Sequence, residues 1–597
     1  MTTEEANQVE NLDRLNENLA KIEKLSERLV AALSNKRQVD HALHGPGHDL
    51  FMKATAAYMA EAMQHPSKLF ERQVAYWGKT LKHYIEAQEA LAEGKLSPPE
   101  DRTPDDPRFS GELWQTHPYF NYIKQQYLMS SEAIHNAVKE IDGLDDKDRK
   151  RIEYFSNQII DMMSPANFLG TNPEALARAV ETEGESLVKG LENLVRDIEA
   201  NDGELLVTLA DKDAFSVGDN LATTPGEVVY RNRMFELIQY APTTETVHET
   251  PLLIFPPWIN KFYIMDLKPK NSLIKWIVDQ GYTLFVVSWV NPDASYADVG
   301  MDEYVDEGYL TAMREVKSIT GQDKINVVGY CIAGTTLALT LGLLQKRGDN
   351  PVKSATFLTT LTDFSDQGEV GVFLDDDFVN GIERQVKEKG ILDSFFMSRT
   401  FSFLRSNDLI YRPAIRSYMM GETPPAFDLL YWNGDGANLP AKMVMQYLRG
   451  LCQGDRLAQG TFEICGETPS LKDIKVPLFA VACETDHIAA WKSSYQGVRQ
   501  MGSRSKTFVL SQSGHIAGII NPPSKMKYGH YTNDGPMGAP EEWREGAEFH
   551  EGSWWPRWGD WLKKRSGKQV PARAPGDSDH PSLGSAPGTY VVPKPSG

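Results

Sequence analysis

The chain has 597 residues, 41% hydrophobic and 24% charged, a balance typical of a globular protein with a large buried core. Its formal net charge of -20 and pI near 5.2 indicate no basic face, which argues against a nucleic-acid-binding protein. The four cysteines form no C-x-x-C pair, so we predict neither a disulfide framework nor a zinc ribbon and expect a reducing compartment. The N-terminus is acidic and polar and lacks the apolar stretch of a signal peptide.

Residues 1–210 are predicted to form an all-helical N-terminal domain. Apolar residues recur there at helical spacing, as in the stripe of Ile152, Phe155, Ile159 and Met162. His41, His44 and His48 lie in a turn that contains glycine and proline, but no acidic residue or cysteine completes a metal-ligand pattern. We therefore expect no metal site and no cofactor.

The pattern changes after about residue 211, where short apolar or β-branched runs begin to alternate with amphipathic helical segments. This alternation predicts a mostly parallel sheet covered on both faces, in a catalytic domain of residues 211–566. The first two strands have no helix between them, which predicts an antiparallel start. The predicted strands are Glu227–Arg231, Phe235–Tyr240, Leu252–Phe255, Thr283–Ser288, Ile325–Gly329, Ser354–Thr359, Leu478–Cys483 and Thr507–Ser511.

The stretch from Lys324 to Leu344 contains a β-branched run, the residues GYCIAG and a helical apolar pattern. It resembles the G-x-S-x-G nucleophile elbow, in which the middle residue lies on a strained strand-to-helix turn. Here Cys331 replaces the serine, and Ala333, followed by Gly334, replaces the second glycine. The pattern predicts a cysteine nucleophile, with a buried structural cysteine as the alternative. The run Ile325–Gln345 carries no charge and is long enough to span a bilayer. Its glycines favour a buried strand and a buried helix, so no transmembrane segment is predicted.

The elbow of an α/β-hydrolase fold predicts an acid after a late strand and a histidine after the last one. Asp486 follows the strand that ends at Cys483, and His515 follows the strand that ends at Ser511. Cys331, Asp486 and His515 are therefore the predicted catalytic triad. Glu484 stays open as an alternative acid and His487 as an alternative base.

Two further segments complete the predicted architecture. The long gap between the sixth and seventh strands predicts a cap subdomain inserted at about residues 360–470. Residues 567–597 are rich in proline, glycine and serine and are predicted to form a flexible C-terminal tail.

The residue types of the triad indicate acyl transfer from a thioester. A thiol with the usual pKa of ~8.5 needs a nearby base, and His515 oriented by Asp486 would supply one. The backbone N–H of Ile332, at a helix N-terminus, is the first predicted oxyanion donor. The second is expected in the loop after the third predicted strand, at Ile259 or Asn260.

Several longer motifs together resemble class I polyhydroxyalkanoate synthases over nearly the whole chain. They are residues 164–168 (SPANF), 171–174 (TNPE), 224–226 (TPG), 256–266 (PPWINKFYIMD), 329–334 (GYCIAG), 425–433 (PAFDLLYWN), 486–487 (DH) and 514–523 (GHIAGIINPP). The family often has glycine where Ala333 stands, and often proline after the acid motif, where this chain has Ala489-Ala490-Trp491.

The resemblance implies an enzyme that polymerises (R)-3-hydroxyacyl-CoA, with short-chain monomers expected, through an acyl group on Cys331. It also implies a homodimer, a cytoplasmic location on polyester granules, and a contact between Arg405 and CoA. Whether His515 or Asp486 activates the acceptor hydroxyl, and whether one or two cysteines carry the chain, stays open. The alternatives are a cysteine-type α/β-hydrolase acting on acyl-CoA or polyester, and a non-catalytic granule-binding protein.

Overall fold

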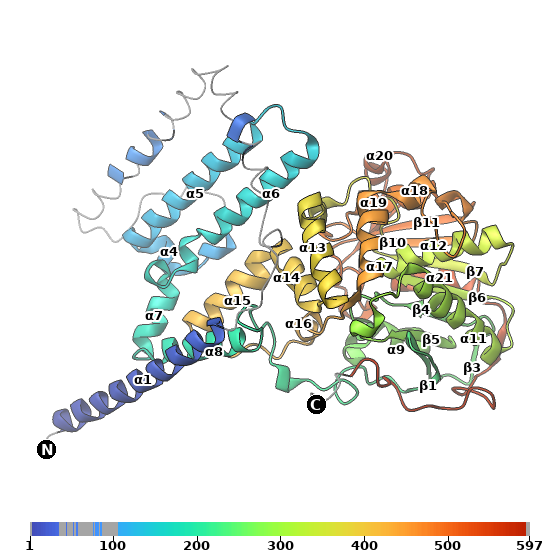
Figure 1. Cartoon of the computed structure of the whole chain (residues 1–597), viewed down its shortest axis with the longest axis horizontal. Helices are drawn as coiled ribbons and strands as arrows, with labels where there is room; N and C mark the ends of the chain where they lie inside the picture. Colours follow the sequence, from blue (N-terminus) through green and yellow to red (C-terminus); the bar gives the residue numbers. More distant parts are fainter. Residues whose placement is uncertain are drawn as a thin grey trace. The chain divides into compact units, whose positions relative to one another are not determined.

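The computed structural model describes residues 3–34, 43, 52, 55–57, 74, 76, 78–82, 84–85 and 106–592. The three histidines of the predicted turn, His41, His44 and His48, lie outside the described residues. The chain divides into two compact units (Figure 1): residues 1–211 with 399–425 form the first, and residues 212–398 with 426–597 form the second. Within the described ranges, no helix is both long enough and apolar enough to cross a bilayer.

The first unit is helical, as predicted. Polar side chains cap several of its helices; the Asn172 side chain, for example, accepts hydrogen bonds from the N–H groups of Glu174 and Ala175. The last long helix of the unit packs against the first through Leu25, Val188 and Val195. The helices are α1 (Thr3–Ser34), α4 (Glu112–Thr116), α5 (Pro118–Lys139), α6 (Asp146–Met162), α7 (Pro173–Glu181) and α8 (Glu185–Glu199).

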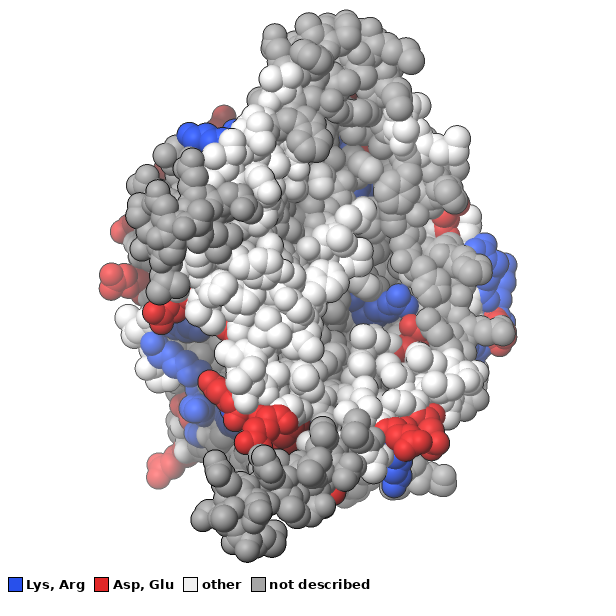
Figure 2. Space-filling model, turned by 90° about the vertical axis from the view of Figure 1, so that its left-hand side faces the viewer, with Lys and Arg blue, Asp and Glu red and all other residues white. Residues whose placement is uncertain are grey.

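Figure 2 shows a face on which uncharged residues cover most of the described centre; charged side chains gather mainly toward its edges, with some just right of the centre. The helical unit also exposes large apolar side chains at the end of α6 and just beyond it. These are Ile159, Met162, Met163 and Phe168, each 45–57% exposed. Clustered exposure of this kind is typical of a contact surface.

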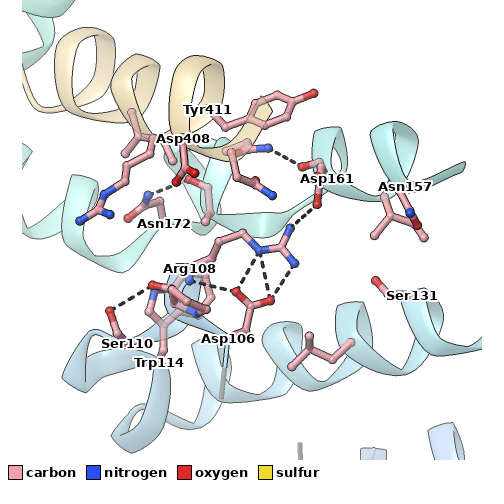
Figure 3. A pocket seen from close by; sticks show the side chains of 18 of the residues that line it. Asp106, Arg108, Ser110, Trp114, Ser131, Asn157, Asp161, Asn172, Asp408 and Tyr411 are labelled. Atoms are coloured by element: carbon pink, nitrogen blue, oxygen red, sulfur yellow. Dashed lines mark hydrogen bonds and ion pairs between the residues drawn. The ribbon is translucent and has the colours of Figure 1, made fainter. Parts of the chain in front are cut away.

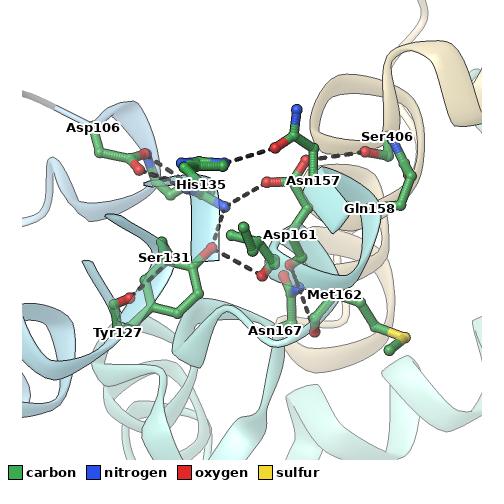
Figure 4. Close-up of polar contacts among 12 residues, drawn as sticks. Asp106, Tyr127, Ser131, His135, Asn157, Gln158, Asp161, Met162, Asn167 and Ser406 are labelled. Atoms are coloured by element: carbon green, nitrogen blue, oxygen red, sulfur yellow. Dashed lines mark hydrogen bonds and ion pairs between the residues drawn. The ribbon is translucent and has the colours of Figure 1, made fainter. Parts of the chain in front are cut away.

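An arginine with three partners joins the helices of this unit. Arg108 donates to Asp106, to Asp161 at 2.9 Å and to the Tyr127 hydroxyl at 2.8 Å, beside a cavity of about 1330 Å³ (Figure 3). A second polar contact, between His135 and Asn157 at 2.6 Å, links α5 to α6 (Figure 4). Since each guanidinium nitrogen of Arg108 donates to an acceptor, this cluster stabilises the helical packing.

The second unit is built on a ten-stranded sheet with the order β1-β2-β5-β4-β6-β7-β10-β11-β12-β13. Strands β5 to β11 of this order run parallel, and antiparallel strands flank them on both sides. The core strands are almost wholly buried, as their continuous apolar runs require. The strands are β1 (Gly226–Arg231), β2 (Phe235–Tyr240), β4 (Leu252–Phe255), β5 (Leu284–Trp289), β6 (Ile325–Tyr330), β7 (Val352–Leu358), β10 (Leu478–Cys483), β11 (Lys506–Ser511), β12 (His530–Thr532) and β13 (Glu548–His550).

Helices cover this sheet, as Figure 1 shows. They are α9 (Leu273–Asp279), α11 (Thr311–Thr320), α12 (Ile332–Arg347), α19 (Trp491–Gln500), α20 (Pro540–Glu545) and α21 (Trp555–Lys563). The eight predicted strands are confirmed to within two residues at each end, and the antiparallel start is confirmed as well. The strands β12 and β13 were not predicted because each has only three residues, too few to show a period.

The predicted cap insertion differs from what the structure contains. Residues 399–425 belong to the helical unit, where the Tyr154 hydroxyl donates to the Phe403 carbonyl at 2.9 Å and the Tyr418 hydroxyl to Asp197 at 2.7 Å. The rest of the insertion stays with the catalytic unit as α13 (Asp376–Lys389), α16 (Asp428–Asn433), α17 (Ala441–Met445) and the paired strands β8 (Ile391–Leu392) and β9 (Leu439–Pro440).

The C-terminal segment also differs from the flexible tail that its composition predicts. Strand β14 (Gln569–Pro571) pairs with β3 (Thr246–His248), and Leu583 and Gly584 exchange backbone hydrogen bonds with Val228 of the edge strand β1. The fully buried carboxylate of Glu236 accepts the N–H groups of Thr589 and Tyr590 at 2.8 and 3.0 Å. An open sheet edge needs partners for its backbone groups, and this segment supplies them.

We expect Glu236→Ala to lower the free energy of unfolding by about 1–3 kcal/mol, because it leaves the two N–H groups and the Arg231 guanidinium without their acceptor. Thermal unfolding and limited proteolysis of the segment beyond residue 577 measure the effect. Lys275→Ala, which removes an exposed ion pair, is the control and should change neither. Equal stability of the two variants would contradict this role for Glu236.

Candidate active site

Cys331 lies on a sharp turn between β6 and α12. Its backbone has φ 54° and ψ -126°, a strained conformation for a residue other than glycine. The turn requires two glycines, because a Cβ on Gly329 would lie 2.6 Å from the Cα of Gly334. Gly334, one residue after the usual place, therefore provides the close approach that Ala333 does not, and the geometry of a nucleophile elbow is retained.

The end of β7 holds this turn. The Leu358 carbonyl accepts the N–H of Cys331 at 2.8 Å, and the Thr360 hydroxyl donates to the carbonyl of Cys331 at 3.2 Å. The side chain of Thr360 also packs directly against Gly334, where an added Cβ would lie 2.0 Å from the threonine oxygen. Thr360 was not predicted from the sequence; its place one residue beyond a predicted strand, next to the elbow, was the only signal for it.

Asp486 lies in the turn after β10, with its carboxylate fully buried. One oxygen, Oδ1, accepts the N–H groups of Ile488 and Ala489 at 2.8 and 2.9 Å, which fixes the direction of the carboxylate. The other oxygen, Oδ2, lies 2.7 Å from Nδ1 of His515. Glu484, the alternative acid, is instead paired with Arg544 at 3.0 Å.

His515 follows β11 and is 8% exposed. Burial alone would lower the pKa of its imidazole, but the charge of Asp486, the charge of Cys331 and hydrogen bonds with both raise this pKa well above the usual 6.5. The ring also stacks on Tyr330, with 6.0 Å between ring centroids. The structure thus brings the three predicted residues together, with the thiol and the carboxylate on the same imidazole, an arrangement that favours a thiolate–imidazolium pair.

The predicted oxyanion donors lie on neighbouring elements. Ile332 is the first residue of α12, where the N–H groups have no acceptor within the helix. Strand β4 pairs with β6, with Phe255 opposite Gly329, so the loop after β4 leaves the sheet beside the elbow. In the part of the chain that the structure describes, the N–H groups of Ile259 and Asn260 meet no acceptor. Their role as donors stays a prediction.

The other cysteines have environments unlike that of Cys331. Burial raises the pKa of the Cys452 thiol to about 12 and that of Cys483 well above its usual value. Burial and the nearby charge of Asp302 raise the pKa of Cys465 to about 11. Thiols with such pKa values stay protonated at neutral pH and are poor nucleophiles.

Arg405, for which a CoA contact is predicted, belongs to the helical unit rather than to the unit that holds the triad. Its guanidinium is about half exposed and pairs with Asp408, three residues further along the same helical stretch. The contact with CoA stays a prediction.

Comparison with known proteins identifies the family of this chain. Residues 105–277 match the family model described as "Poly-beta-hydroxybutyrate polymerase (PhaC) N-terminus", and residues 251–522 match that of the "alpha/beta hydrolase fold". The chain is 43% identical over 532 residues to the "Poly(3-hydroxyalkanoate) polymerase" of Methylorubrum extorquens, covering 89% of this chain and 87% of the relative. It is 40% identical over 539 residues to the "Poly(3-hydroxyalkanoate) polymerase subunit PhaC" of Cupriavidus necator, with 89% of each chain covered. With an α/β-hydrolase fold, a cysteine at its elbow and this identity over most of its length, the chain belongs to the poly(3-hydroxyalkanoate) polymerase family.

Proposed function

We propose that this protein is an acyltransferase that polymerises (R)-3-hydroxyacyl-CoA into a polyester, with release of CoA, through an acyl group carried on Cys331. The observation that carries the proposal is that Cys331, on a strained elbow, and Asp486 both hydrogen-bond the imidazole of His515. The names of the relatives, as poly(3-hydroxyalkanoate) polymerases, support the polyester as product.

In the first half-reaction, the Cys331 thiolate attacks the thioester carbonyl of acyl-CoA and forms a tetrahedral oxyanion. The N–H of Ile332 and one N–H of the loop at Ile259 or Asn260 stabilise that oxyanion. The carbon–sulfur bond to CoA then breaks. The leaving CoA thiolate takes the proton from the His515 imidazolium, and acyl-Cys331 remains.

In the second half-reaction, the 3-hydroxyl of another acyl unit attacks the carbonyl of acyl-Cys331. The hydroxyl proton passes to His515, whose imidazole is neutral after CoA has left, and Asp486 stabilises the imidazolium that forms. The bond to Cys331 breaks, the thiolate is restored, and one ester bond has been made. Activation of the hydroxyl by Asp486 is the alternative; however, both carboxylate oxygens of Asp486 are already engaged.

A cysteine suits this reaction because a thioester on CoA is exchanged for a thioester on the enzyme. The two have similar free energies, so the acyl-enzyme keeps its reactivity toward a hydroxyl. The half-buried setting of Cys331, packed against the core of the catalytic unit, supports protection of that thioester from water.

The proposal extends to the surroundings of the enzyme. We place it in the cytoplasm as a homodimer on the surface of polyester granules, with short-chain monomers as preferred substrates. The exposed apolar side chains at the end of α6 support contact with an apolar surface such as the granule.

The experiment that tests the proposal supplies the purified protein with (R)-3-hydroxybutyryl-CoA. We expect CoA release together with insoluble polymer, and no CoA release from Cys331→Ala. CoA release with free 3-hydroxybutyrate as the only other product would instead identify a hydrolase. Unchanged product formation by Cys331→Ala would identify a non-catalytic protein in a contaminated preparation.

A further inference from the structure

The loop after β4, which carries the predicted second oxyanion donor, is held by a short segment of the insertion. This segment, Asp428–Ala437, comprises α16 and the four residues after it. The Trp432 indole N–H donates to the Lys261 carbonyl at 2.7 Å, and the Ala437 N–H donates to the Ile259 carbonyl at 3.2 Å. A backbone bridge also joins Asn260 to Gly436. Both parts belong to the same compact unit.

An ion pair lies at the centre of this contact. Lys261 Nζ lies 2.6 Å from Asp435 Oδ1, with only 9% and 20% of the two side chains exposed. The other oxygen of Asp435 accepts the Tyr263 hydroxyl at 2.7 Å. Burial, and then the charge of Asp435, raise the pKa of Tyr263, so its hydroxyl stays a donor. Asp435 thereby fixes two residues of the loop at once, and loss of its charge leaves a nearly buried ammonium unpaired.

These contacts determine which backbone groups of the loop remain available. The carbonyls of Ile259 and Lys261 both face the segment Asp428–Ala437 and are occupied. A peptide group is planar, so fixing the carbonyl of one residue fixes the N–H of the next in the opposite direction. The N–H of Asn260 is therefore directed away from Asp428–Ala437. Among the described residues it donates to no acceptor. The indole N–H of Trp258 fixes the loop from the other side, on Thr336 of α12 at 3.2 Å.

We infer that Asp435 and Lys261 are positioning residues of the oxyanion hole: their ion pair holds the loop so that the Asn260 N–H faces the acyl group on Cys331. Neither side chain acts on the substrate itself. The inference rests on the proposed function, because it assumes that an acyl group is transferred to Cys331.

The test measures acylation in single turnover with (R)-3-hydroxybutyryl-CoA, with active sites counted by the acyl-Cys331 that each preparation forms. Lys261→Met and Asp435→Asn should each lower the acylation rate constant per active site by about 10–100-fold, since a displaced donor loses most of its effect. The concentration of substrate at half-maximal rate should change less than about threefold, and the pH dependence set by His515 should not move. The double variant should be no slower than the slower single variant, because both changes break one contact.

The control is Lys442→Met, which removes another ion pair of the insertion, 3.6 Å from Glu303 and 44% exposed, and should acylate at the wild-type rate. If Lys261→Met does not fold, Tyr263→Phe, which keeps the ion pair, replaces it in the comparison. Tyr263→Phe should slow acylation less than Asp435→Asn does. Wild-type rates per active site in Asp435→Asn would overturn the inference. Failure of the wild-type protein to form any acyl-Cys331 would instead overturn the proposed function, before the variants are compared.

Discussion

Replacing Asp486 with asparagine is expected to lower CoA release from 3-hydroxyacyl-CoA by about 10⁴-fold at neutral pH. The carboxylate lies 2.7 Å from Nδ1 of His515 and holds the ring so that its other nitrogen faces Cys331. An asparagine of the same size keeps the packing but removes the charge and allows the wrong tautomer. Steady-state assays of CoA release measure the loss.

The pH dependence should change in a defined direction. Burial lowers the pKa of His515, and Asp486 is the largest of the causes that raise it well above 6.5. Without that charge the pKa of His515 falls, the imidazolium is lost at a lower pH, and the thiolate loses its counter-ion. Acylation by the variant should therefore require a higher pH than acylation by the wild type, and its residual activity should rise with pH.

Glu484→Gln is the matched control, because Glu484 is two residues away and is paired with Arg544 instead of His515. It should retain nearly full activity with an unchanged pH profile. If Glu484→Gln were the inactive variant and Asp486→Asn the active one, the assignment of the acid would be wrong.

Gly334→Ala is the second change with a large expected effect. Its Cβ would lie 2.0 Å from Oγ1 and 2.7 Å from Cγ2 of Thr360, and no real contact is that short. The overpacking should lower the free energy of unfolding by about 1–3 kcal/mol. It should also displace the carbonyl contact between Thr360 and Cys331 and lower the acylation rate by roughly 100-fold. Thermal unfolding and single-turnover acylation measure the two effects.

Gly371→Ala provides the comparison, since its added methyl group would meet nothing closer than the Gln367 Cβ at 3.6 Å. It should unfold and react like the wild type. Adding Thr360→Ala to Gly334→Ala removes the two nearest clashing atoms and leaves only the Thr360 Cβ at 2.9 Å, so it should recover part of the lost stability, but not the hydrogen bond to Cys331. Equal stability of Gly334→Ala and Gly371→Ala would rule out the packing argument.

The sheet and the clustering of Cys331, Asp486 and His515 were predictable because their signals are local and their order along the chain is constrained. Continuous apolar runs identify buried parallel strands, and the residues that follow such strands meet at one edge of the sheet. Cys331, Asp486 and His515 each follow a strand of this kind, so three separate short motifs predicted one cluster.

The remaining features depend on contacts between distant segments, which no periodicity reports. Residues 399–425 resemble any amphipathic helical stretch, and only hydrogen bonds such as that of Tyr418 with Asp197 assign them to the helical unit. The C-terminal composition is that of a flexible segment, but the buried Glu236 and the free edge of β1 bind it. The pairing of Lys261 with Asp435 joins residues 174 positions apart, which are only two charges among many in the sequence.

The most direct test of the central claim is to mix the protein with (R)-3-hydroxybutyryl-CoA, quench within milliseconds, and locate the acyl group by mass spectrometry of peptides. The acyl group should be found on the peptide that contains Cys331, at up to one group per chain, and should be absent from Cys331→Ala. An acyl group on Cys452, Cys465 or Cys483 with none on Cys331, or polymer formed with no acyl-cysteine at any time, would contradict the proposed mechanism.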